Sequence, residues 1–280
     1  NLFFQGFCSF IKENIMDIIE KIINEIKEKT KKEYIKLIAE PCDSMTQFDS
    51  KLGGIPYIPD NFEYPYSRTN PQQPLKLLAQ INFADMPEIE EFKHLKGILQ
   101  IYINPDDMYG WDYDNYTNQD NFRVIYHKDI DFNADNSDKI PQISYDDGCF
   151  PVEKEVKLSG IKEYDWMDAE TESHNKICCE IYNKYSDEKI NSLYDLDDDI
   201  SEKIYEESNW GHKIGGYANY TQGEDFDDNY SVQLLQFDSE MIDGEYYIIW
   251  GDSGVAHWFI NSEKLKNLDF SDIRYLWDCC

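Results

Sequence analysis

The sequence is short of basic residues. It holds 26 Lys and Arg against 56 Asp and Glu, which gives a formal net charge of −30 over 280 residues. Such a chain repels the phosphates of DNA and RNA, so we exclude nucleic-acid binding as its expected role. It attracts a basic molecule and speeds the encounter, and we therefore expect a basic protein as its partner. Solubility is the alternative explanation of the same charge, and it requires no partner.

Long apolar runs are also missing. No stretch of about 18 apolar residues occurs, so we predict no membrane-spanning segment and no membrane partner. Nor does a positively charged leader with an apolar centre stand near the start, which leads us to expect a cytoplasmic protein. Residues 1–6, Asn-Leu-Phe-Phe-Gln-Gly, resemble a tag-cleavage site of a viral protease and are interpreted as a vector remnant.

Cysteine pairs at metal-binding spacing are absent. The seven cysteines are odd in number and scattered, and no Cys-x-x-Cys occurs. This excludes a zinc ribbon and a disulfide framework, and we expect mostly reduced thiols. His174 stands four residues before Cys178, but two ligands do not complete a site, so no metal is predicted. Phosphate-binding and dinucleotide-binding glycine motifs are missing as well, and no cofactor is predicted.

A coherent catalytic set is lacking. "GDSG" at 251–254 is similar to the nucleophile motif of trypsin-like proteases, but a serine nucleophile needs a histidine base backed by a carboxylate. No histidine segment of that kind occurs here. Asp252-Ser253-Gly254 suits a hairpin turn equally well, and we predict that hairpin between strands at 246–250 and 255–260. We therefore assign no catalytic residue, and an enzyme of unknown chemistry stays an alternative.

What the chain does have is an internal repeat. Lys51-Leu52-Gly53-Gly54 returns as Lys213-Ile214-Gly215-Gly216. Two further blocks follow in the same order, at offsets within a few residues of the first: 75–86 with 232–241, and 97–104 with 254–261. Three blocks in one order at a nearly constant offset predict a duplicated unit.

The repeat sets the expected domain organisation and fold. We expect residues 7–280 to form a single compact domain with two repeats, about 34–104 and 204–280, and an acidic insertion between them. The predicted fold class is α+β, internally duplicated, with a mainly antiparallel sheet and a few helices. Isoleucines at helical spacing predict an N-terminal amphipathic helix over 10–32.

Shorter signals complete the expected elements. β-branched and aromatic stretches predict strands at 34–39 and 122–127, and the repeated blocks predict further strands. Beyond the first helix, helical patterns occur in parts of 161–185 and at about 196–208.

The paired glycines indicate a ligand site between the repeats. Glycine reaches positive φ and allows a ligand or another backbone to come close. The matching glutamines of the second block both donate and accept hydrogen bonds. The candidate lining is Lys51, Gly53, Gly54, Gln80, Lys213, Gly215, Gly216, Gln236, Trp250 and Asp252. The alternative is that the turns are structural and the amides satisfy buried backbone groups.

Two acidic segments, 161–209 and 220–243, are candidate partner surfaces, and the second holds seven Asp and Glu and no Lys. Residues 161–209 hold 15 Asp and Glu against five Lys, and within them Asp197, Asp198 and Asp199 are the candidate partner-binding residues. The alternative is that these acids cap a helix. The run at 108–122 mixes Tyr and Trp with Asp, which is typical of a contact surface or of a loop that packs on its own strands.

Several motifs together resemble one family. In chain order they are "SKLGGIPYIP", "PLKLLAQINFADMP", "GILQIYI", "HKIGGYANYTQG", "LLQFDSE", "WGDSGVAHWFI" and "DFSDIRYLWDCC". The ordered set is similar to the YwqG-like family of bacterial proteins over residues 40–280. The resemblance implies an internally duplicated α+β fold and a cytosolic protein, and it supplies no mechanism.

Two positions depart from that family's pattern. Ala218 stands where Pro is usual, and Ser253 stands where Ala is frequent, which weakens any nucleophile assignment. The resemblance also implies an immunity or antitoxin-like role. We therefore expect a non-catalytic interaction protein that binds a basic partner. The alternatives are a small-molecule-binding module and an enzyme of unknown chemistry with a ligand site between the repeats.

Overall fold

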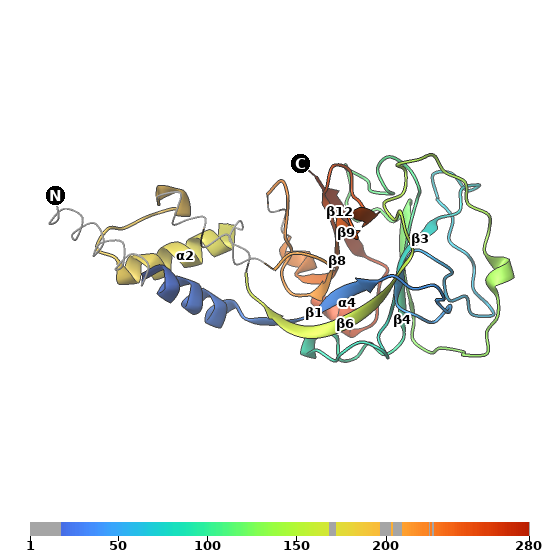
Figure 1. Cartoon of the computed structure of the whole chain (residues 1–280), viewed down its shortest axis with the longest axis horizontal. Helices are drawn as coiled ribbons and strands as arrows, with labels where there is room; N and C mark the ends of the chain where they lie inside the picture. The colour runs from blue at the N-terminus through green and yellow to red at the C-terminus, as the bar shows by residue number, and fades with distance from the viewer. Residues whose placement is uncertain are drawn as a thin grey trace. The chain divides into compact units, whose positions relative to one another are not determined.

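The computed structural model describes residues 18–167, 172–196, 203, 209–223, 225 and 227–279 (Figure 1). The chain divides into two compact units. The smaller consists of Asn1–Lys32, Tyr164–Trp210 and Gly216–Asp225, and the larger of Glu33–Glu163, Gly211–Gly215 and Phe226–Cys280. The larger unit contains most of both predicted repeats, and the single-domain organisation stays a prediction.

A ten-stranded sheet dominates the larger unit. Its order is β12-β11-β8-β7-β1-β6-β2-β3-β4-β5, and the strand pairs with defined register are antiparallel. The strands are β1 (Lys32–Glu40), β2 (Lys51–Leu52), β3 (Lys76–Asn82), β4 (Ile98–Ile103), β5 (Phe122–His127), β6 (Val156–Asp165), β7 (Lys213–Gly215), β8 (Val232–Asp238), β11 (Val255–Ile260) and β12 (Ile273–Asp278).

The remaining elements of the larger unit are short. Strands β9 (Glu240–Ile242) and β10 (Glu245–Ile248) form a separate two-stranded sheet. The helical pieces are η1 (Glu90–Phe92), η2 (Ser137–Lys139), η4 (Asp228–Tyr230) and α4 (Ser262–Lys266). A mixed fold with a mostly antiparallel sheet and few helices is therefore confirmed.

The core lies along the inner strands. β3, β4, β8 and β11 are buried over almost their whole length. Their sequences are mostly apolar, which is typical of strands covered on both faces, and they also bury polar residues such as Gln80, Gln236 and His257. Large rings complete this core, and burying each such side chain stabilises the fold by about 1.5–3 kcal/mol. They include Phe237, Trp250, Trp258 and Tyr275.

Most strand predictions are confirmed, and one hairpin is wrong. β5 coincides with the predicted strand at 122–127, and β1 contains 34–39. The hairpin predicted between 246–250 and 255–260 does not form, because β10 pairs with β9 while β11 lies between β8 and β12. The turn that does form is at Asp243-Gly244, with φ of 53° and 83°. Asp-Gly is the residue pair that a two-residue hairpin with positive φ at both positions favours.

The two halves of the sheet correspond strand by strand. From the centre outward, one half runs β2-β3-β4-β5 and the other β7-β8-β11-β12. Lys51 pairs with Gln80 in the first half, and Lys213 pairs with Gln236 in the second. An irregularity leaves Leu78 without a partner on β4, and another leaves Leu234 without one on β11.

The two central strands are paired crosswise. β1 precedes β2 in the chain but pairs with β7, and β6 precedes β7 but pairs with β2. The pairings match in detail, since Leu37 N donates to His212 O at 2.9 Å and Leu158 N donates to Ser50 O at 2.8 Å. The strands also share a local sequence, Ile35-Lys36-Leu37 in β1 and Val156-Lys157-Leu158 in β6.

The smaller unit is helical in its described part. Residues 18–30 form a helix, and α2 (Glu172–Tyr185) and η3 (Leu193–Asp195) follow later in the chain. Ile19, Ile22 and Ile26 of the first helix are buried in one cluster with residues of α2 and η3. None of the helices that the structure describes has the length and apolar character needed to traverse a lipid bilayer.

Candidate functional site

The two predicted Gly-Gly turns have the same backbone conformation. Gly53 and Gly54 have φ of 66° and 74°, and Gly215 and Gly216 have φ of 73° and 74°. Residues other than glycine rarely adopt these angles, so both turns require their glycines for conformation alone.

The lysine of the first turn is buried beneath it. Lys51 is 1% exposed, and its Nζ donates to the carbonyl oxygens of Thr46 and Ile55, both at 2.6 Å. Burial lowers the pKa of this ammonium from 10.5 to about 8. Lys213 is buried to the same extent and lies 5.7 Å from the centre of the Tyr34 ring. Lys51 therefore holds its own loop closed.

The matching glutamines also bind backbone. Gln80 Nε2 donates to the carbonyl oxygens of Gln47 and Asp49 at 2.8 and 2.9 Å, and its Oε1 accepts from Tyr57 N at 2.9 Å. Gln236 Nε2 donates to Gly211 O at 2.9 Å. Amides in such positions satisfy buried peptide groups, which is the structural alternative that the sequence left open.

The other two predicted ligand residues, Trp250 and Asp252, differ in their exposure to solvent. Trp250 is fully buried in the core, whereas Asp252 is exposed in the turn that follows it. Ser253 Oγ lies 2.8 Å from Tyr246 Oη. The partner-binding triplet Asp197, Asp198 and Asp199 lies outside the described residues.

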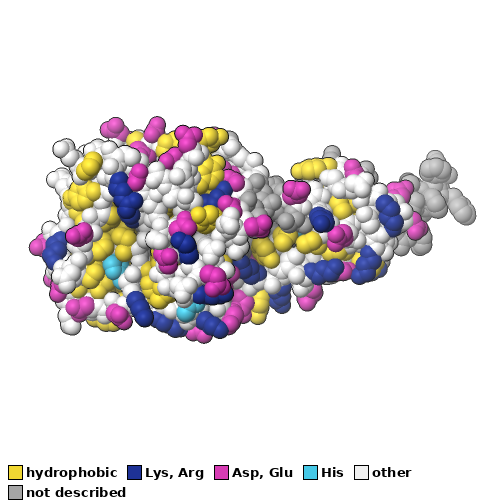
Figure 2. Space-filling model, turned by 180° about the vertical axis from the view of Figure 1, so that it is seen from behind, with side chains coloured by type: hydrophobic (Ala, Val, Ile, Leu, Met, Phe, Trp, Pro, Cys, Tyr) yellow, Lys and Arg dark blue, Asp and Glu magenta, His cyan; other side chains and the backbone are white. Residues whose placement is uncertain are grey.

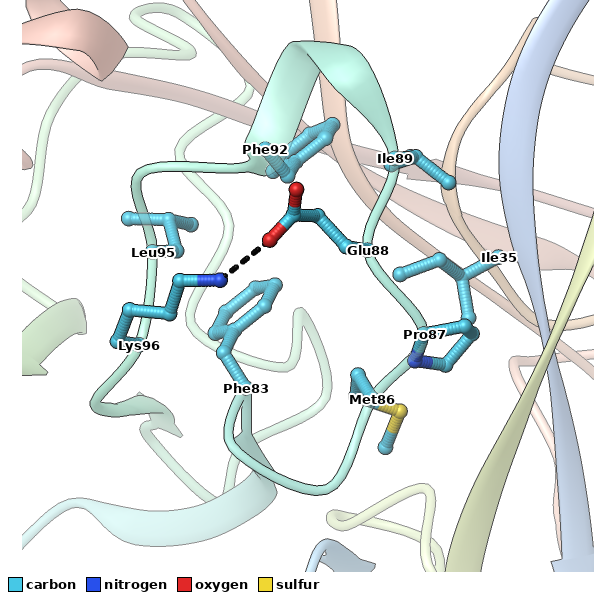
Figure 3. A pocket seen from close by; sticks show the side chains of 9 residues that line it. All are labelled: Ile35, Phe83, Met86, Pro87, Glu88, Ile89, Phe92, Leu95 and Lys96. Carbon is cyan, nitrogen blue, oxygen red and sulfur yellow. Dashed lines mark hydrogen bonds and ion pairs between the residues drawn. The ribbon is translucent and has the colours of Figure 1, made fainter.

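A shallow pocket opens beside β1, away from the predicted ligand residues. It has about 230 Å³ of empty space and is lined by Ile35, Phe83, Met86, Pro87, Glu88, Ile89, Phe92, Leu95 and Lys96. Figure 3 shows the Glu88 carboxylate and the Lys96 ammonium meeting beside its apolar side chains, at 2.6 Å. None of the ten predicted ligand residues belongs to this lining. The pocket suits an apolar group, and it offers no nucleophile.

The sequence analysis missed a hydrogen-bonded chain around His212. This ring is buried, and its Nδ1 accepts from Asp238 N at 3.0 Å, so the neutral ring carries its proton on Nε2. Nε2 lies 2.8 Å from Tyr247 Oη, and Tyr247 Oη donates to Glu240 Oε2 at 2.5 Å. His212 precedes β7 and Asp238 ends β8, whereas Glu240 and Tyr247 lie in the separate sheet of β9 and β10. Tertiary contacts between the two sheets bring these residues together.

Burial perturbs the ionisation of this chain. It raises the pKa of Asp238 from 3.8 to about 6 and lowers the pKa of His212. The pKa of Tyr247 is raised by burial and by its bond to Glu240. The first half has a neutral counterpart, in which Asn82 N donates to Ser50 Oγ at 2.8 Å. Among the described residues, no three His, Cys, Asp or Glu side chains are grouped to hold a metal ion.

An exposed group of aromatic side chains lies in the long connection between β4 and β5. Residues 104–121, called the acidic loop below, contain five Asp and no Lys or Arg. Tyr113 is 69% exposed, and its ring centre lies 5.4 Å from that of Trp111 and 6.5 Å from that of Tyr116. Trp111 lies in turn 5.3 Å from Tyr116. Three rings and several carboxylates thus share one segment of the surface.

The acidic loop is tied down at several points. Asp112 Oδ1 accepts from Asp114 N and Asn115 N, and its Oδ2 accepts from Asn118 Nδ2 at 2.8 Å. These bonds lower the pKa of Asp112, which stays charged. On the β12 side, Tyr275 N donates to Tyr116 O at 2.9 Å. The predicted packing of this run on its own strands is therefore present, and it leaves Tyr113 outside.

Comparison with known families identifies the chain at the level of a domain. Residues 50–279 match DUF1963, a domain of unknown function. The match covers most of the chain, so the protein belongs to the DUF1963 family. No curated protein matches it.

Proposed function

We propose that this member of the DUF1963 family is a non-catalytic recognition protein for a basic protein partner, and that the acidic loop provides its contact surface. The observation that supports this most directly is Tyr113, which is 69% exposed on a loop with five Asp and no Lys or Arg. Exposed Tyr and Trp dominate the binding energy of protein interfaces. Carboxylates around them select a basic partner.

The acidic loop is held in a defined conformation, which favours binding. A connection of this length without helix or strand is uncommon in a compact unit and usually has a function. Asp112 and its three hydrogen bonds hold the loop in one conformation before any partner arrives. A preordered loop loses less conformational entropy on association, so more of the contact energy contributes to affinity.

Negative charge alone does not identify the contact surface. In Figure 2, acidic side chains are spread over the visible face with Lys and Arg between them. Many of these acids are already in ion pairs, such as Glu88 with Lys96 and Glu245 with Lys154. The acidic loop holds five Asp and no basic residue of its own. Asp120 pairs with Arg68 at 3.6 Å, and the other four have no ion pair among the described residues, which distinguishes the loop from that mixed surface. Asp197, Asp198 and Asp199 stay a second candidate contact.

The first test is capture of a partner by the full chain at about 0.1 M and about 1 M salt, because the Debye length falls from about 10 Å to about 3 Å over that range. We expect a basic protein that associates quickly at low salt and slowly at high salt. Tyr113→Ala combined with Asp114→Asn should weaken this association at least about tenfold, a loss of the size seen at interface hot spots. Phe132→Ala is the matched control, since Phe132 is 67% exposed and lies outside the acidic loop and outside residues 161–209.

A captured partner that is not basic, or one whose association ignores both salt and the loop variant, would contradict the proposal. Surface-plasmon kinetics with purified partner measure both effects on the same sensor. A faster dissociation of the double variant assigns the loss to the ring contact, and a slower association assigns it to the charge.

The pocket of Figure 3 favours a second candidate function, the binding of a small apolar molecule. Its lining includes seven apolar side chains around a single ion pair. Small-molecule sites are mostly apolar with a few polar groups, which is the composition of this lining. Co-purification of an apolar metabolite that is lost in Phe83→Ala would support this alternative.

We also infer that the two halves of the sheet arose by duplication. The matching strand order, the matching lysine–glutamine pairs and the unpaired Leu78 and Leu234 support this inference. The motif order likewise supports placement among the YwqG-like bacterial proteins, a cytoplasmic location and an immunity or antitoxin-like role.

A further inference from the structure

We propose that the acidic loop recognises an arginine side chain, which stacks on Tyr113 while Asp114 accepts its guanidinium hydrogen bonds. This inference rests on the proposed function and specifies its chemistry. It names the residue type that a basic partner has to present, and it predicts that lysine is a poorer substitute.

The protein already seats one of its own arginines on the same aromatic group. The Arg274 guanidinium lies 4.9 Å from the centre of the Tyr116 ring and 5.9 Å from that of Phe259. Tyr116 is the neighbour of Tyr113 and Trp111 in the loop. A guanidinium against a tyrosine of this group is therefore a contact that the local geometry and electrostatics accept.

The Tyr113 ring is exposed, so a second guanidinium can stack on it. Its ring meets Trp111 at 71° and Tyr116 at 60°, so the three rings are mutually tilted rather than stacked. With 69% of its surface exposed, Tyr113 has most of its area available to a planar guest.

Asp114 supplies the matching charge. Asp112 uses its oxygens on the loop itself, whereas the carboxylate of Asp114 is exposed and has no ion pair in the part of the chain that the structure describes. A guanidinium carries five donors in a planar fork, so one face can lie on a ring while an edge binds a carboxylate.

Arginine fits these features better than lysine. Its flat, weakly hydrated cation stacks on aromatic faces, while the ammonium of lysine is compact and strongly hydrated. Cation–π contacts at exposed sites are modest, so we expect a preference for arginine over lysine of about two- to fivefold. The long-range attraction of the acidic body is the same for both cations, and it cancels in the comparison.

The test uses two fluorescein-labelled octapeptides, one alternating Gly and Arg and one alternating Gly and Lys, with equal charge and length. Fluorescence anisotropy measures their Kd for the full chain. We expect the arginine peptide to bind the wild type about two- to fivefold more tightly. Tyr113→Ala should reduce this ratio to about one, and Tyr113→Phe should keep it because the ring face remains. Asp114→Asn should weaken the arginine peptide more than the lysine peptide.

The remaining outcomes separate the two proposals. Equal affinities for both peptides in the wild type, or an arginine preference that survives Tyr113→Ala, overturn the arginine site and leave the proposed function standing. Absence of binding of either peptide to the wild type at low salt overturns both. Phe132→Ala serves again as the control, and it should change neither Kd.

Discussion

At the scale of single residues, Lys51 carries a charge that burial makes costly. Its pKa falls from 10.5 to about 8 on folding. Between pH 8 and 10.5 the unfolded chain holds a proton that the folded chain has released, so this group adds stability as pH rises. The shift corresponds to about 3 kcal/mol.

Lys51→Met removes that dependence. We expect the unfolding free energy of the wild type, minus that of the variant, to rise by up to about 3 kcal/mol as the pH moves through this window. Urea unfolding of both proteins in steps of pH measures the difference. A difference that stays flat over this pH range would contradict the cost assigned to burial.

The stability contribution of Asp238 changes with pH in the opposite direction. Its pKa rises from 3.8 to about 6 on folding, so between these values the folded chain binds the extra proton and stability falls as pH rises. Asp238→Asn carries no charge and keeps one oxygen, whereas Ser239 N and Gly211 N bond to different oxygens of Asp238, so one of these two bonds is lost at every pH. We expect the wild type to lose up to about 3 kcal/mol relative to this variant between pH 4 and pH 6.5 or so.

The comparison of the two proteins isolates Asp238 from its titrating neighbours. His212, Glu240 and Lys213 act on it and are present in both, so their own titration largely cancels. Chemical unfolding at several pH values is again the measurement. If the wild type instead became more stable relative to the variant as pH rises, the pKa of Asp238 would not be raised on folding.

At the scale of elements, the two Gly-Gly turns predict unequal costs. An alanine Cβ at Gly215 would lie 3.2 Å from Phe92 and 3.3 Å from Ile89, both packed in the core. At Gly53 it would lie 3.3 Å from Glu155 and from Val152, and Glu155 is exposed and able to move. Left-handed backbone adds about 1–2 kcal/mol at either position.

We therefore expect Gly215→Ala to destabilise the protein by more than Gly53→Ala. Gly148→Ala is the matched control, because Gly148 has φ of 80° and an alanine methyl group there would have no described atom within 4 Å. Thermal unfolding of the three variants separates the backbone cost from the packing cost. Equal losses in all three would show that φ alone requires these glycines.

Local signals predicted some strands well and others not at all. β5 coincides with 122–127 because Phe-Arg-Val-Ile-Tyr-His is β-branched, aromatic and bounded by polar turns. The sequence does not predict β6, because Gly160 and a charged stretch interrupt its apolar pattern. Residues 161–165 fall instead within the segment where a helical pattern was predicted. Crosswise pairing of β1 and β6 depends on contacts far apart in the chain, and no local pattern encodes such a register.

At the scale of the whole molecule, candidate sites were harder to predict than strands. Lys51 and Gln80 were predicted to line a ligand site, and in the structure both side chains donate hydrogen bonds to backbone carbonyl groups. The chain from His212 to Glu240 could not be found in the sequence, because Tyr247 reaches it from another sheet. The acidic loop was visible from its composition alone, and only its geometry distinguishes exposed Tyr113 from packed Tyr109.

Because the central strands pair crosswise, β1 is synthesised long before β7, the strand with which it pairs. Ile35 of β1 pairs with Ile214, 179 positions later, whereas Lys51 of β2 waits for Lys157. At about 5–20 residues per second, β1 emerges roughly ten to thirty-five seconds before its partner is synthesised. During that interval the nascent chain exposes an unpaired strand edge, which is a site where other chains add. Slowing translation after residue 40 should therefore increase aggregation, while a pause after residue 215 should have no such effect.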